Sequence, residues 1–239
     1  MKKNFKNLKE KNLNYINNIS STWFFLDTGT NDGIFNMSSD NFLLDSMSNK
    51  LIKFPLLRVY GWVEPTLSIG ANQLVIEPIQ KASVVKRVTG GQAVLHGLQD
   101  DELTYSVFIN YGYKVKQLYL EIGEILLTFL NIYDLKGEFG YSANNYFKNF
   151  DCFSSKTEAD IVVNDMKVIG SAQCRKKNYV LQHGSIKLDI MRRLLGKNPD
   201  FEQAKINLKK AFEDKLKINF IDYTLTENDC KKIKNGSNN

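Results

Sequence analysis

The sequence has few of the residues that mark several large classes of protein. Its three cysteines are too few and too scattered for a disulfide framework, and none belongs to a Cys-x-x-Cys zinc pair: Cys152, Cys174 and Cys230. We therefore expect reduced thiols and a cytoplasmic location. The two histidines lie far apart in the sequence, without clustered cysteines or carboxylates, so no metal cofactor is expected.

Long apolar segments are also absent. No stretch approaches the ~20 apolar residues that a membrane helix needs, so no membrane association is expected. The first residues are basic, but no apolar segment follows them, which argues against a secretory signal. We expect residues 1–18 to be a basic tail or a frayed helix. Residues 19–239 are expected to form a single domain with a helical C-terminal segment.

The chain carries a net charge of +6, but its basic residues are spread along the whole sequence. They form no patch with interleaved aromatic residues, and no nucleic-acid-binding motif is present. A nucleic-acid partner is therefore not expected. A mildly basic surface is compatible with an acidic protein partner, which it would attract by electrostatic steering.

The spacing of apolar residues predicts both helices and strands. Helical spacing predicts helices at 33–47, 117–133 and 201–216. Short apolar or alternating segments predict strands at 23–26, 56–62, 66–70, 82–87, 103–109, 159–163, 167–174 and 179–189. Turns are expected at 27–29 and at 164–165. This mixture favours an α+β domain with a largely antiparallel sheet.

A pair of glycines marks the first candidate site, in the segment from Arg87 to His96. Gly90 and Gly91 would let the backbone approach a ligand closely and point its N–H groups inward, as a cradle for an oxyanion or a phosphate requires. The same Thr-Gly-Gly composition is common in ordinary tight turns, and both interpretations stay open.

Small residues mark a second candidate in the segment from Lys167 to Gln173. In a strand, period two places Lys167, Ile169, Ser171 and Gln173 on one face. The alternative for Lys167 is a solvated hairpin lysine. His183, the other histidine beside a glycine, is the third candidate, and its alternative is a structural role.

Cys152 is the fourth candidate because it lies in an apparent loop ahead of two predicted strands. Loops commonly carry functional residues on a rigid scaffold. A free cysteine can equally be a small buried hydrophobe. Cys174 is a rival nucleophile, although strand alternation puts it on the face opposite Lys167.

Taken together, these segments resemble the superfamily of lipoate–protein ligases, biotin–protein ligases and octanoyltransferases. The resemblance is closest to the cysteine-dependent octanoyltransferase branch and covers about Trp23 to Asp189. It is carried by seven motifs in the right order: 23–29, 58–62, 65–70, 87–96, 102–106, 167–173 and 181–184. It implies a catalytic-domain fold like that of the biotin and lipoate ligases, α+β, with a largely antiparallel mixed sheet flanked by helices.

The resemblance also implies roles for individual residues. Cys152 matches the position of the nucleophile in the thiol-dependent branch. Lys167 matches the lysine that contacts the acyl carbonyl. The residues expected to bind the acyl substrate are Arg87, Thr89, Gly90, Gly91, Val94, His96, Gly170, Ser171, Ala172, Gln173 and His183.

The expected reaction is a two-step transfer of an octanoyl group. Cys152 would take the acyl group from acyl carrier protein, and a lysine of a lipoyl-type domain would then accept it. Lys167 would favour the Cys152 thiolate and, with N–H groups near the glycine pair, stabilise the oxyanion. No cofactor is expected beyond the acyl group itself, which is a substrate.

Three alternatives remain open. The chain could be an ATP-dependent lipoate ligase, with Lys167 holding an acyl-adenylate. It could be an amidotransferase that takes the acyl group from another lipoyl-type protein, or a carrier-binding module without chemistry. Ligases of this superfamily commonly carry an accessory C-terminal domain, whereas about fifty residues follow Asp189 here, and this difference favours acyl transfer.

Overall fold

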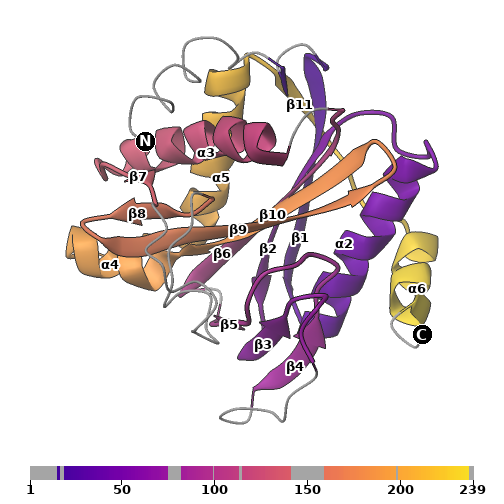
Figure 1. Ribbon diagram of the computed structural model, residues 1–239, viewed down its shortest axis with the longest axis horizontal. Coiled ribbons are helices and arrows are strands. Elements are labelled where there is room, and N and C mark those ends of the chain that lie inside the picture. Colours follow the sequence, from indigo (N-terminus) through magenta and orange to yellow (C-terminus); the bar gives the residue numbers. More distant parts are fainter. Residues whose placement is uncertain are drawn as a thin grey trace.

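A computed structural model describes residues 15–16, 19–74, 82–98, 100–112, 115–140, 159–197 and 199–236. An eight-stranded sheet in the order β11-β1-β2-β6-β10-β9-β8-β7 forms its centre (Figure 1). Its strands are β1 (Thr22–Asn31), β2 (Leu56–Trp62), β6 (Glu102–Asn110), β7 (Glu138–Phe139), β8 (Ile161–Val163), β9 (Met166–Lys176), β10 (Tyr179–Lys187) and β11 (Asn219–Asp222). Both pairings of β1 are parallel and the others are antiparallel. The expected α+β fold with a largely antiparallel mixed sheet is confirmed.

A second, three-stranded sheet lies beside the first, in the order β4-β3-β5. It consists of β3 (Thr66–Ile69), β4 (Ser83–Lys86) and β5 (Val94–His96). The sequence predicts β2 and β3 as two strands joined by a turn, and the structure places them in different sheets. The chain therefore leaves the large sheet after Trp62 and returns to it only at Glu102.

Helices cover both faces of the large sheet. Val107 of β6 packs against the cluster formed by α3 (Val115–Ile132) and α5 (Phe201–Leu216), while its neighbour Phe108 packs against α2 (Gly33–Ser48). In β10, Val180 likewise packs against the cluster of α3 and α5, and Leu181 packs against the cluster of α2. Successive side chains of a strand point to opposite faces, so each strand supplies both cores. Two further helices are α4 (Leu188–Leu195) and α6 (Glu227–Gly236).

The helix α2 buries polar as well as apolar residues. Leu43, Leu44 and Met47 form its apolar face. Asn36 and Asp40, one turn apart on the same helix, are also buried, at 0% and 1% exposed. Both contact the guanidinium of Arg58 in β2. A buried charge needs a partner, so this side of α2 is anchored by polar contacts.

The structure corrects two boundaries. The turn predicted at 27–29 is an irregularity inside β1, where the pairing with β2 shifts between Asp27 and Thr30. Gly29 adopts a φ of +64° there, and its N–H donates to the Asp27 carboxylate at 2.8 Å. The strand predicted to end at Asp189 ends at Lys187, because Leu188 begins α4.

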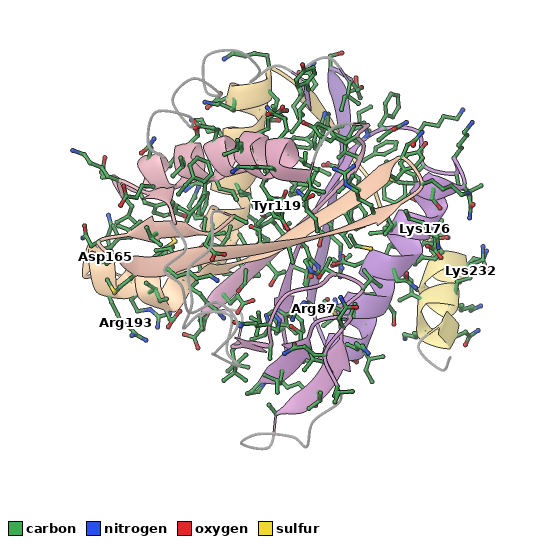
Figure 2. All side chains as sticks on the ribbon, in the orientation of Figure 1. Arg87, Tyr119, Asp165, Lys176, Arg193 and Lys232 are labelled. Carbon is green, nitrogen blue, oxygen red and sulfur yellow. The ribbon has the colours of Figure 1, made fainter. Side chains whose placement is uncertain are left out.

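The hairpin between β8 and β9 contains Lys167, the lysine that the sequence proposes as functional. Asn164 and Asp165 form its turn with φ values of 47° and 63°, a conformation that Asn and Asp tolerate well. Asp165 lies at the outer edge of the molecule (Figure 2). The register of the hairpin shifts between Ile161 and Val162, next to Lys167.

The first residues that the structure describes pack against the core. Ile16 is 1% exposed and belongs to the cluster under α3. Its backbone N–H donates to the carboxylate of Glu121 at 2.9 Å. The predicted tail of 1–18 otherwise lies outside the described residues. No helix within the described ranges is long and apolar enough to cross a membrane.

Candidate active site

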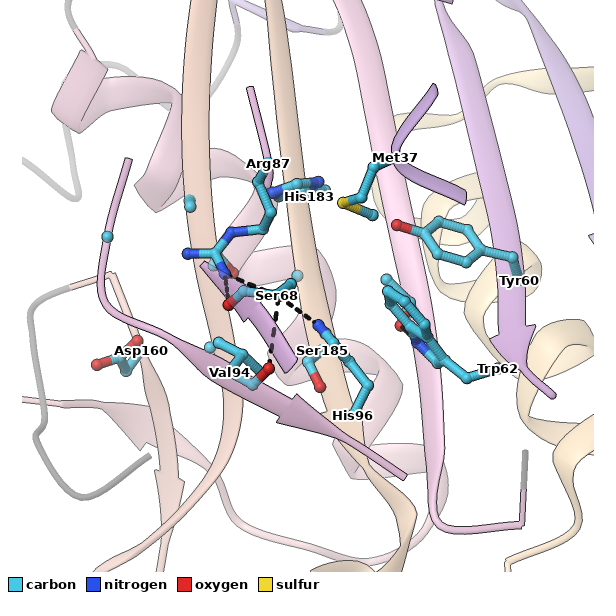
Figure 3. Close-up of a pocket in the computed structure, with 16 residues that line it drawn as sticks. Met37, Tyr60, Trp62, Ser68, Arg87, Val94, His96, Asp160, His183 and Ser185 are labelled. Carbon is cyan, nitrogen blue, oxygen red and sulfur yellow. Dashed lines mark hydrogen bonds between the residues drawn. The ribbon is translucent and has the colours of Figure 1, made fainter. Parts of the chain in front are cut away.

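A pocket lies between the two sheets and encloses about 590 Å³ of space, part of which is open solvent. Its walls come from β9 and β10 on one side and from β3, β5 and the loop after β4 on the other (Figure 3). The lining residues are Met37, Tyr60, Trp62, Ser68, Arg87, Gly91, Val94, His96, Thr104, Asp160, Gly170, Ser171, Ala172, His183, Gly184 and Ser185.

The two ends of the pocket differ in chemistry. Met37, Tyr60 and Trp62 form an apolar cluster and lie together on one side of Figure 3. Asp160 lies on the opposite side of the same view. The pocket can therefore take a ligand with an apolar body and a polar or reactive end.

Arg87 organises the glycine loop. Its Nη1 donates to the carbonyl oxygen of Ser68 at 2.5 Å and to the Ser68 hydroxyl at 2.8 Å. Its Nη2 donates to the carbonyl oxygens of Gly90 at 3.2 Å and Gln92 at 2.8 Å. The guanidinium thus ties the loop after β4 to strand β3, and it reaches the pocket while doing so.

The glycine loop packs directly on the end of β3. A Cβ atom on Gly70 would collide with the carbonyl oxygen of Gly91, so only glycine allows this approach. Gly91 itself has a φ of +97°, in the left-handed region that favours glycine. Gly91 is therefore a backbone requirement, and it also lines the pocket.

His183 lies between a buried carboxylate and a hydroxyl. Its Nδ1 is 2.9 Å from Asp40 Oδ2, and its Nε2 is 2.7 Å from Thr89 Oγ1. Burial tends to raise the pKa of Asp40, but the Arg58 charge and the contact with His183 hold that pKa below its ordinary value. Asp40 is thus ionised and accepts the Nδ1–H, while the Thr89 hydroxyl is the hydrogen-bond partner of Nε2.

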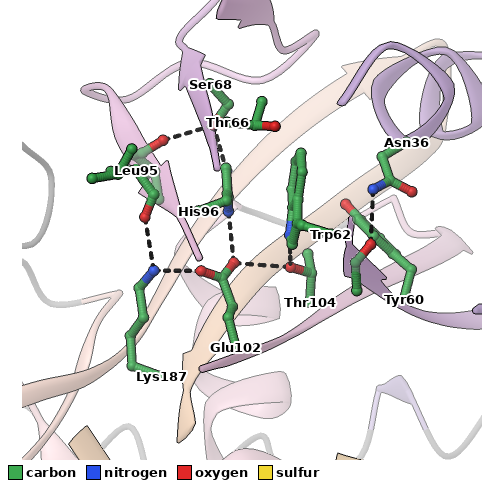
Figure 4. Close-up of polar contacts among 12 residues, drawn as sticks. Asn36, Tyr60, Trp62, Thr66, Ser68, Leu95, His96, Glu102, Thr104 and Lys187 are labelled. Carbon is green, nitrogen blue, oxygen red and sulfur yellow. Dashed lines mark hydrogen bonds and ion pairs between the residues drawn. The ribbon is translucent and has the colours of Figure 1, made fainter. Parts of the chain in front are cut away.

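His96 has an equivalent arrangement. Its Nδ1 is 2.6 Å from Glu102 Oε1, and its Nε2 is 2.6 Å from Ser68 Oγ (Figure 4). Trp62 stacks on the imidazole with ring centroids 3.8 Å apart. Burial lowers the pKa of His96 to about 4, although Glu102 acts in the opposite direction. The ring is therefore neutral near pH 7.

Glu102 is held ionised in the interior. Burial raises its pKa, but His96 and Lys187 together bring that pKa well below its usual range. Lys187 Nζ forms an ion pair with Glu102 Oε2, and Thr104 donates to Oε1 at 3.0 Å. Trp62 Nε1 in turn donates to the Thr104 hydroxyl at 2.9 Å. A dense polar network thus backs the wall of the pocket that contains His96.

Lys167 is buried, which contradicts the alternative of a solvated hairpin lysine. Its side chain is 2% exposed, and its Nζ is 3.1 Å from Asp160 Oδ2. Asp160 lines the pocket, whereas Lys167 is not a lining residue. Strand β9 therefore brings an ion-paired lysine to the edge of the cavity.

The structure sorts the residues that the sequence proposes. The pocket is lined by Arg87, Gly91, Val94, His96, Gly170, Ser171, Ala172 and His183. Thr89 contacts the imidazole of His183 through its hydroxyl, and the carbonyl oxygen of Gly90 accepts a hydrogen bond from Arg87. Gln173 donates to Gln182 at 2.7 Å and is not a lining residue. Cys152 lies outside the described residues.

Eight lining residues are missing from the sequence-based selection: Met37, Tyr60, Trp62, Ser68, Thr104, Asp160, Gly184 and Ser185. Several of them belong to motifs that carry the family resemblance, and this signal could have found them. Met37 and Asp160 have no local signal. Ser185 has a buried hydroxyl without a hydrogen-bond partner.

The other described cysteines contribute nothing to this pocket. Cys174 packs at the edge of the α2 cluster, on the face opposite Gln173. Burial raises the pKa of its thiol. Cys230 lies on α6, away from the lining residues. Within the described ranges, no cluster of three or more His, Cys, Asp or Glu residues could hold a metal.

Comparison with known proteins agrees with this architecture. The model of the lipoyl protein ligase A/B catalytic domain matches residues 32–215. The octanoyltransferase LipM of Halalkalibacterium halodurans is 34% identical over 89% of this chain and 94% of its own length. These matches confirm the expected superfamily and the expectation of an acyltransferase enzyme.

Solved structures share the fold at lower identity. A lipoate-protein ligase A bound with ATP superposes with a TM-score of 0.71 at 19% identity, covering 91% of this chain and 94% of the ligase. A bipartite lipoate protein ligase from Thermoplasma acidophilum, determined in a study of an archaeal lipoylation system with its E2 lipoyl domain, gives 0.68 at 17% identity and covers 91% of each chain. Fold, pocket and sequence similarity together place this chain in the lipoyl protein ligase A/B catalytic-domain family.

Proposed function

We propose that this protein transfers an octanoyl group from acyl carrier protein to a lysine of a lipoyl-type domain. A similar protein along most of the chain is an octanoyltransferase, LipM. The acceptor is supported by the study of a ligase of the same fold together with its E2 lipoyl domain. The net charge of +6 suits an acidic carrier protein as donor.

The observation that carries the proposal is a two-ended pocket with a buried lysine at its polar edge. Met37, Tyr60 and Trp62 offer an apolar surface for the acyl chain. Burying such a chain contributes about 0.8 kcal/mol per methylene. Lys167 is ion-paired with Asp160, which lines the pocket, and this supports the proposed contact between the lysine and the acyl carbonyl.

The proposed chemistry proceeds through a thioester on Cys152. The Cys152 thiolate attacks the carbonyl carbon of the octanoyl donor, and the donor sulfur leaves as a thiol with a proton from the Lys167 ammonium. The amine of the acceptor lysine then attacks the enzyme thioester, its proton returns to the proposed acceptor, and Cys152 is released as the thiolate. Dividing the transfer into two steps is the usual benefit of a covalent intermediate.

Lys167 is proposed to act in both steps. An ammonium at the pocket edge favours the thiolate and stabilises the oxyanion that forms on the acyl carbonyl. In the second step the incoming amine must lose a proton, and Lys167 or a histidine of the pocket is the proposed acceptor. The reaction requires neither a metal nor ATP.

The direct test is the intact mass of the purified protein after incubation with octanoyl-acyl carrier protein in the absence of ATP. We expect the mass of one octanoyl group on the chain, mapped to Cys152, and its transfer when a lipoyl-type domain is added. Cys152→Ala should abolish both steps. The matched control is Cys174→Ala, which removes a described cysteine that does not line the pocket.

Other outcomes favour other mechanisms. An octanoyl group mapped to Cys174 contradicts the assignment of the nucleophile. Formation of AMP from ATP and free octanoate, with no acylated thiol, shows a ligase. Transfer from an octanoylated lipoyl-type domain but not from acyl carrier protein shows an amidotransferase.

A further inference from the structure

Ser68, His96 and Glu102 form a continuous hydrogen-bonded chain on the pocket wall. Ser68 Oγ is 2.6 Å from His96 Nε2, and His96 Nδ1 is 2.6 Å from Glu102 Oε1. The three residues come from β3, β5 and β6, which belong to two different sheets. Ser68 and His96 both line the pocket (Figure 3). A hydroxyl, an imidazole and a carboxylate in this order are the constellation of a serine nucleophile.

The protonation states of Glu102 and His96 allow Ser68 to act as a nucleophile. Glu102 is ionised because His96 and Lys187 hold its pKa below its usual range, so it accepts the Nδ1–H of His96. The lone pair of Nε2 consequently faces the Ser68 hydroxyl. Stacking on Trp62 fixes the ring plane. The imidazole is neutral near pH 7 because burial lowers its pKa, so its Nε2 can accept a proton.

Arg87 adds a positive charge to the same hydroxyl. Its Nη1 lies 2.8 Å from Ser68 Oγ. As the Ser68 proton moves to His96, negative charge develops on Oγ, and a charge-assisted hydrogen bond to a guanidinium stabilises it.

We propose that Ser68 is a second nucleophile of this protein, with His96 as its general base and Glu102 as a positioning residue, and that it slowly hydrolyses acyl thioesters and esters bound in the pocket. The proposal rests on the proposed function only in taking a medium acyl chain as the pocket's ligand. It does not require Cys152.

The proposed hydrolysis balances with water as the second reactant. Ser68 Oγ attacks the acyl carbonyl carbon while its proton passes to His96 Nε2. The bond from this carbon to the leaving sulfur or oxygen breaks, and the leaving group takes that proton. Water then attacks the serine ester with His96 as base, the acid is released, and Ser68 regains its proton.

A second hydrogen-bonded series of a carboxylate, a histidine and a hydroxyl shows why the nucleophile is assigned to Ser68. Asp40, His183 and Thr89 have similar distances, 2.9 and 2.7 Å. Thr89, however, does not line the pocket, whereas Ser68 does. Both hydroxyl residues are buried, at 0% exposed, but Ser68 is a lining residue, so of these two it is the one that borders the cavity.

The experiment uses Cys152→Ala as the background, so that the proposed thiol chemistry is absent. Hydrolysis of p-nitrophenyl octanoate is followed by release of p-nitrophenolate, and a fluorophosphonate probe is used to trap the nucleophile. We expect measurable hydrolysis and a covalent phosphonate on Ser68. Adding Ser68→Ala should lower hydrolysis by at least ~100-fold, which is the scale of a lost acid–base pair, and should prevent labelling.

Two further variants separate chemistry from folding. Ser68→Cys keeps a nucleophile and should accumulate an octanoyl thioester at position 68, visible by intact mass. Ser39→Ala is the matched control, because Ser39 is a fully buried serine on α2 that does not line the pocket. It should retain the hydrolysis rate of the background within about twofold.

Several results would contradict the proposal that Ser68 is a nucleophile. Unchanged hydrolysis in the Ser68→Ala variant, or a phosphonate mapped elsewhere, overturns it. A folded Ser68→Cys variant that acquires no acyl group also overturns it. Octanoyl transfer by the unmodified protein is measured in parallel, so a failure of the proposed transfer function and a failure of Ser68 hydrolysis are read from different assays.

Discussion

His183 Nδ1 lies 2.9 Å from Asp40 Oδ2, although 143 residues separate the two in sequence. The same carboxylate accepts hydrogen bonds from Arg58 at 2.7 Å and Ser106 at 2.9 Å. Asp40 therefore joins α2 to strands β2, β6 and β10, and one of these partners, His183, lines the pocket. It determines both the orientation of His183 and the packing of the helix.

Replacing Asp40 should destabilise the fold strongly. Asp40→Asn leaves the Arg58 charge buried without its carboxylate, which typically costs about 3–5 kcal/mol of the free energy of unfolding. The matched control is Asp45→Asn on the same helix, whose ion pair with Lys176 is largely exposed and should contribute about 0–1 kcal/mol. Urea denaturation of both variants measures the difference. Equal losses would contradict the buried anchor.

His96 should make the stability depend on pH in a defined window. Its folded pKa of about 4 lies below the ~6.5 of an unfolded histidine, so the unfolded chain binds more protons between these values. Stability should therefore fall as the pH drops from ~6.5 to ~4. His96→Gln removes the titrating group and should flatten this slope in urea denaturation. Parallel slopes for the two proteins would show that His96 is not buried in its neutral form.

Lys167 should be required for both half-reactions. Lys167→Ala is expected to slow acylation and transfer by about 10²–10⁴-fold, because the oxyanion and the proton lose their partner. Lys167→Arg should not restore the rate, since arginine does not accept a proton near neutral pH and its fork does not fit the site of an ammonium. Single-turnover assays measure the two steps separately.

The control for Lys167 lies on the same strand. Lys176, 47% exposed, lies beside α2 at the periphery of the molecule (Figure 2). Lys176→Ala should leave both rates within about twofold. Near-normal rates in Lys167→Ala would instead reduce Lys167 to a structural partner of Asp160.

Met37 should limit the length of the acyl chain. It comes from α2, is 8% exposed and closes the apolar end of the pocket with Tyr60 and Trp62. Met37→Ala should raise kcat/KM for decanoyl relative to octanoyl donors by roughly tenfold, for two methylenes at ~0.8 kcal/mol each. Ile34→Ala, an exposed position on the same helix, is the control. An unchanged ratio would place the chain end elsewhere.

Salt should weaken the encounter with the partners and leave the chemistry unchanged. If the net charge of +6 steers an acidic donor, kcat/KM falls as the ionic strength rises to physiological values, where the Debye length is about 8 Å. The single-turnover rate at saturating partner should stay nearly constant, because it reports events inside the pocket. If kcat/KM does not change with ionic strength, electrostatic steering does not contribute to the encounter. Duplex DNA and RNA should compete poorly.

Local patterns in the sequence are sufficient to predict many of the helices, strands and turns. The structure gives α5 and β2 the bounds that apolar spacing predicts, 201–216 and 56–62. The turn at Asn164 and Asp165 is also local, because both residues tolerate positive φ. Helix α4, β11 and α6 were not predicted. Strand β11 has only four residues, mostly exposed, and forms by pairing with β1.

For the site, the sequence by itself determined which segments matter, because glycines and small residues record where a backbone must approach closely. Gly91 and Gly170 in the motifs do line the pocket. Only the tertiary structure decided the partners: Asp40 for His183, Glu102 and Ser68 for His96, and Met37 for the apolar end. The local sequence around Asp40 or Met37 looks like any helix. Their roles depend on the register of β2, β6 and β10 and on the position of α2 over them, which the packing of the whole domain determines.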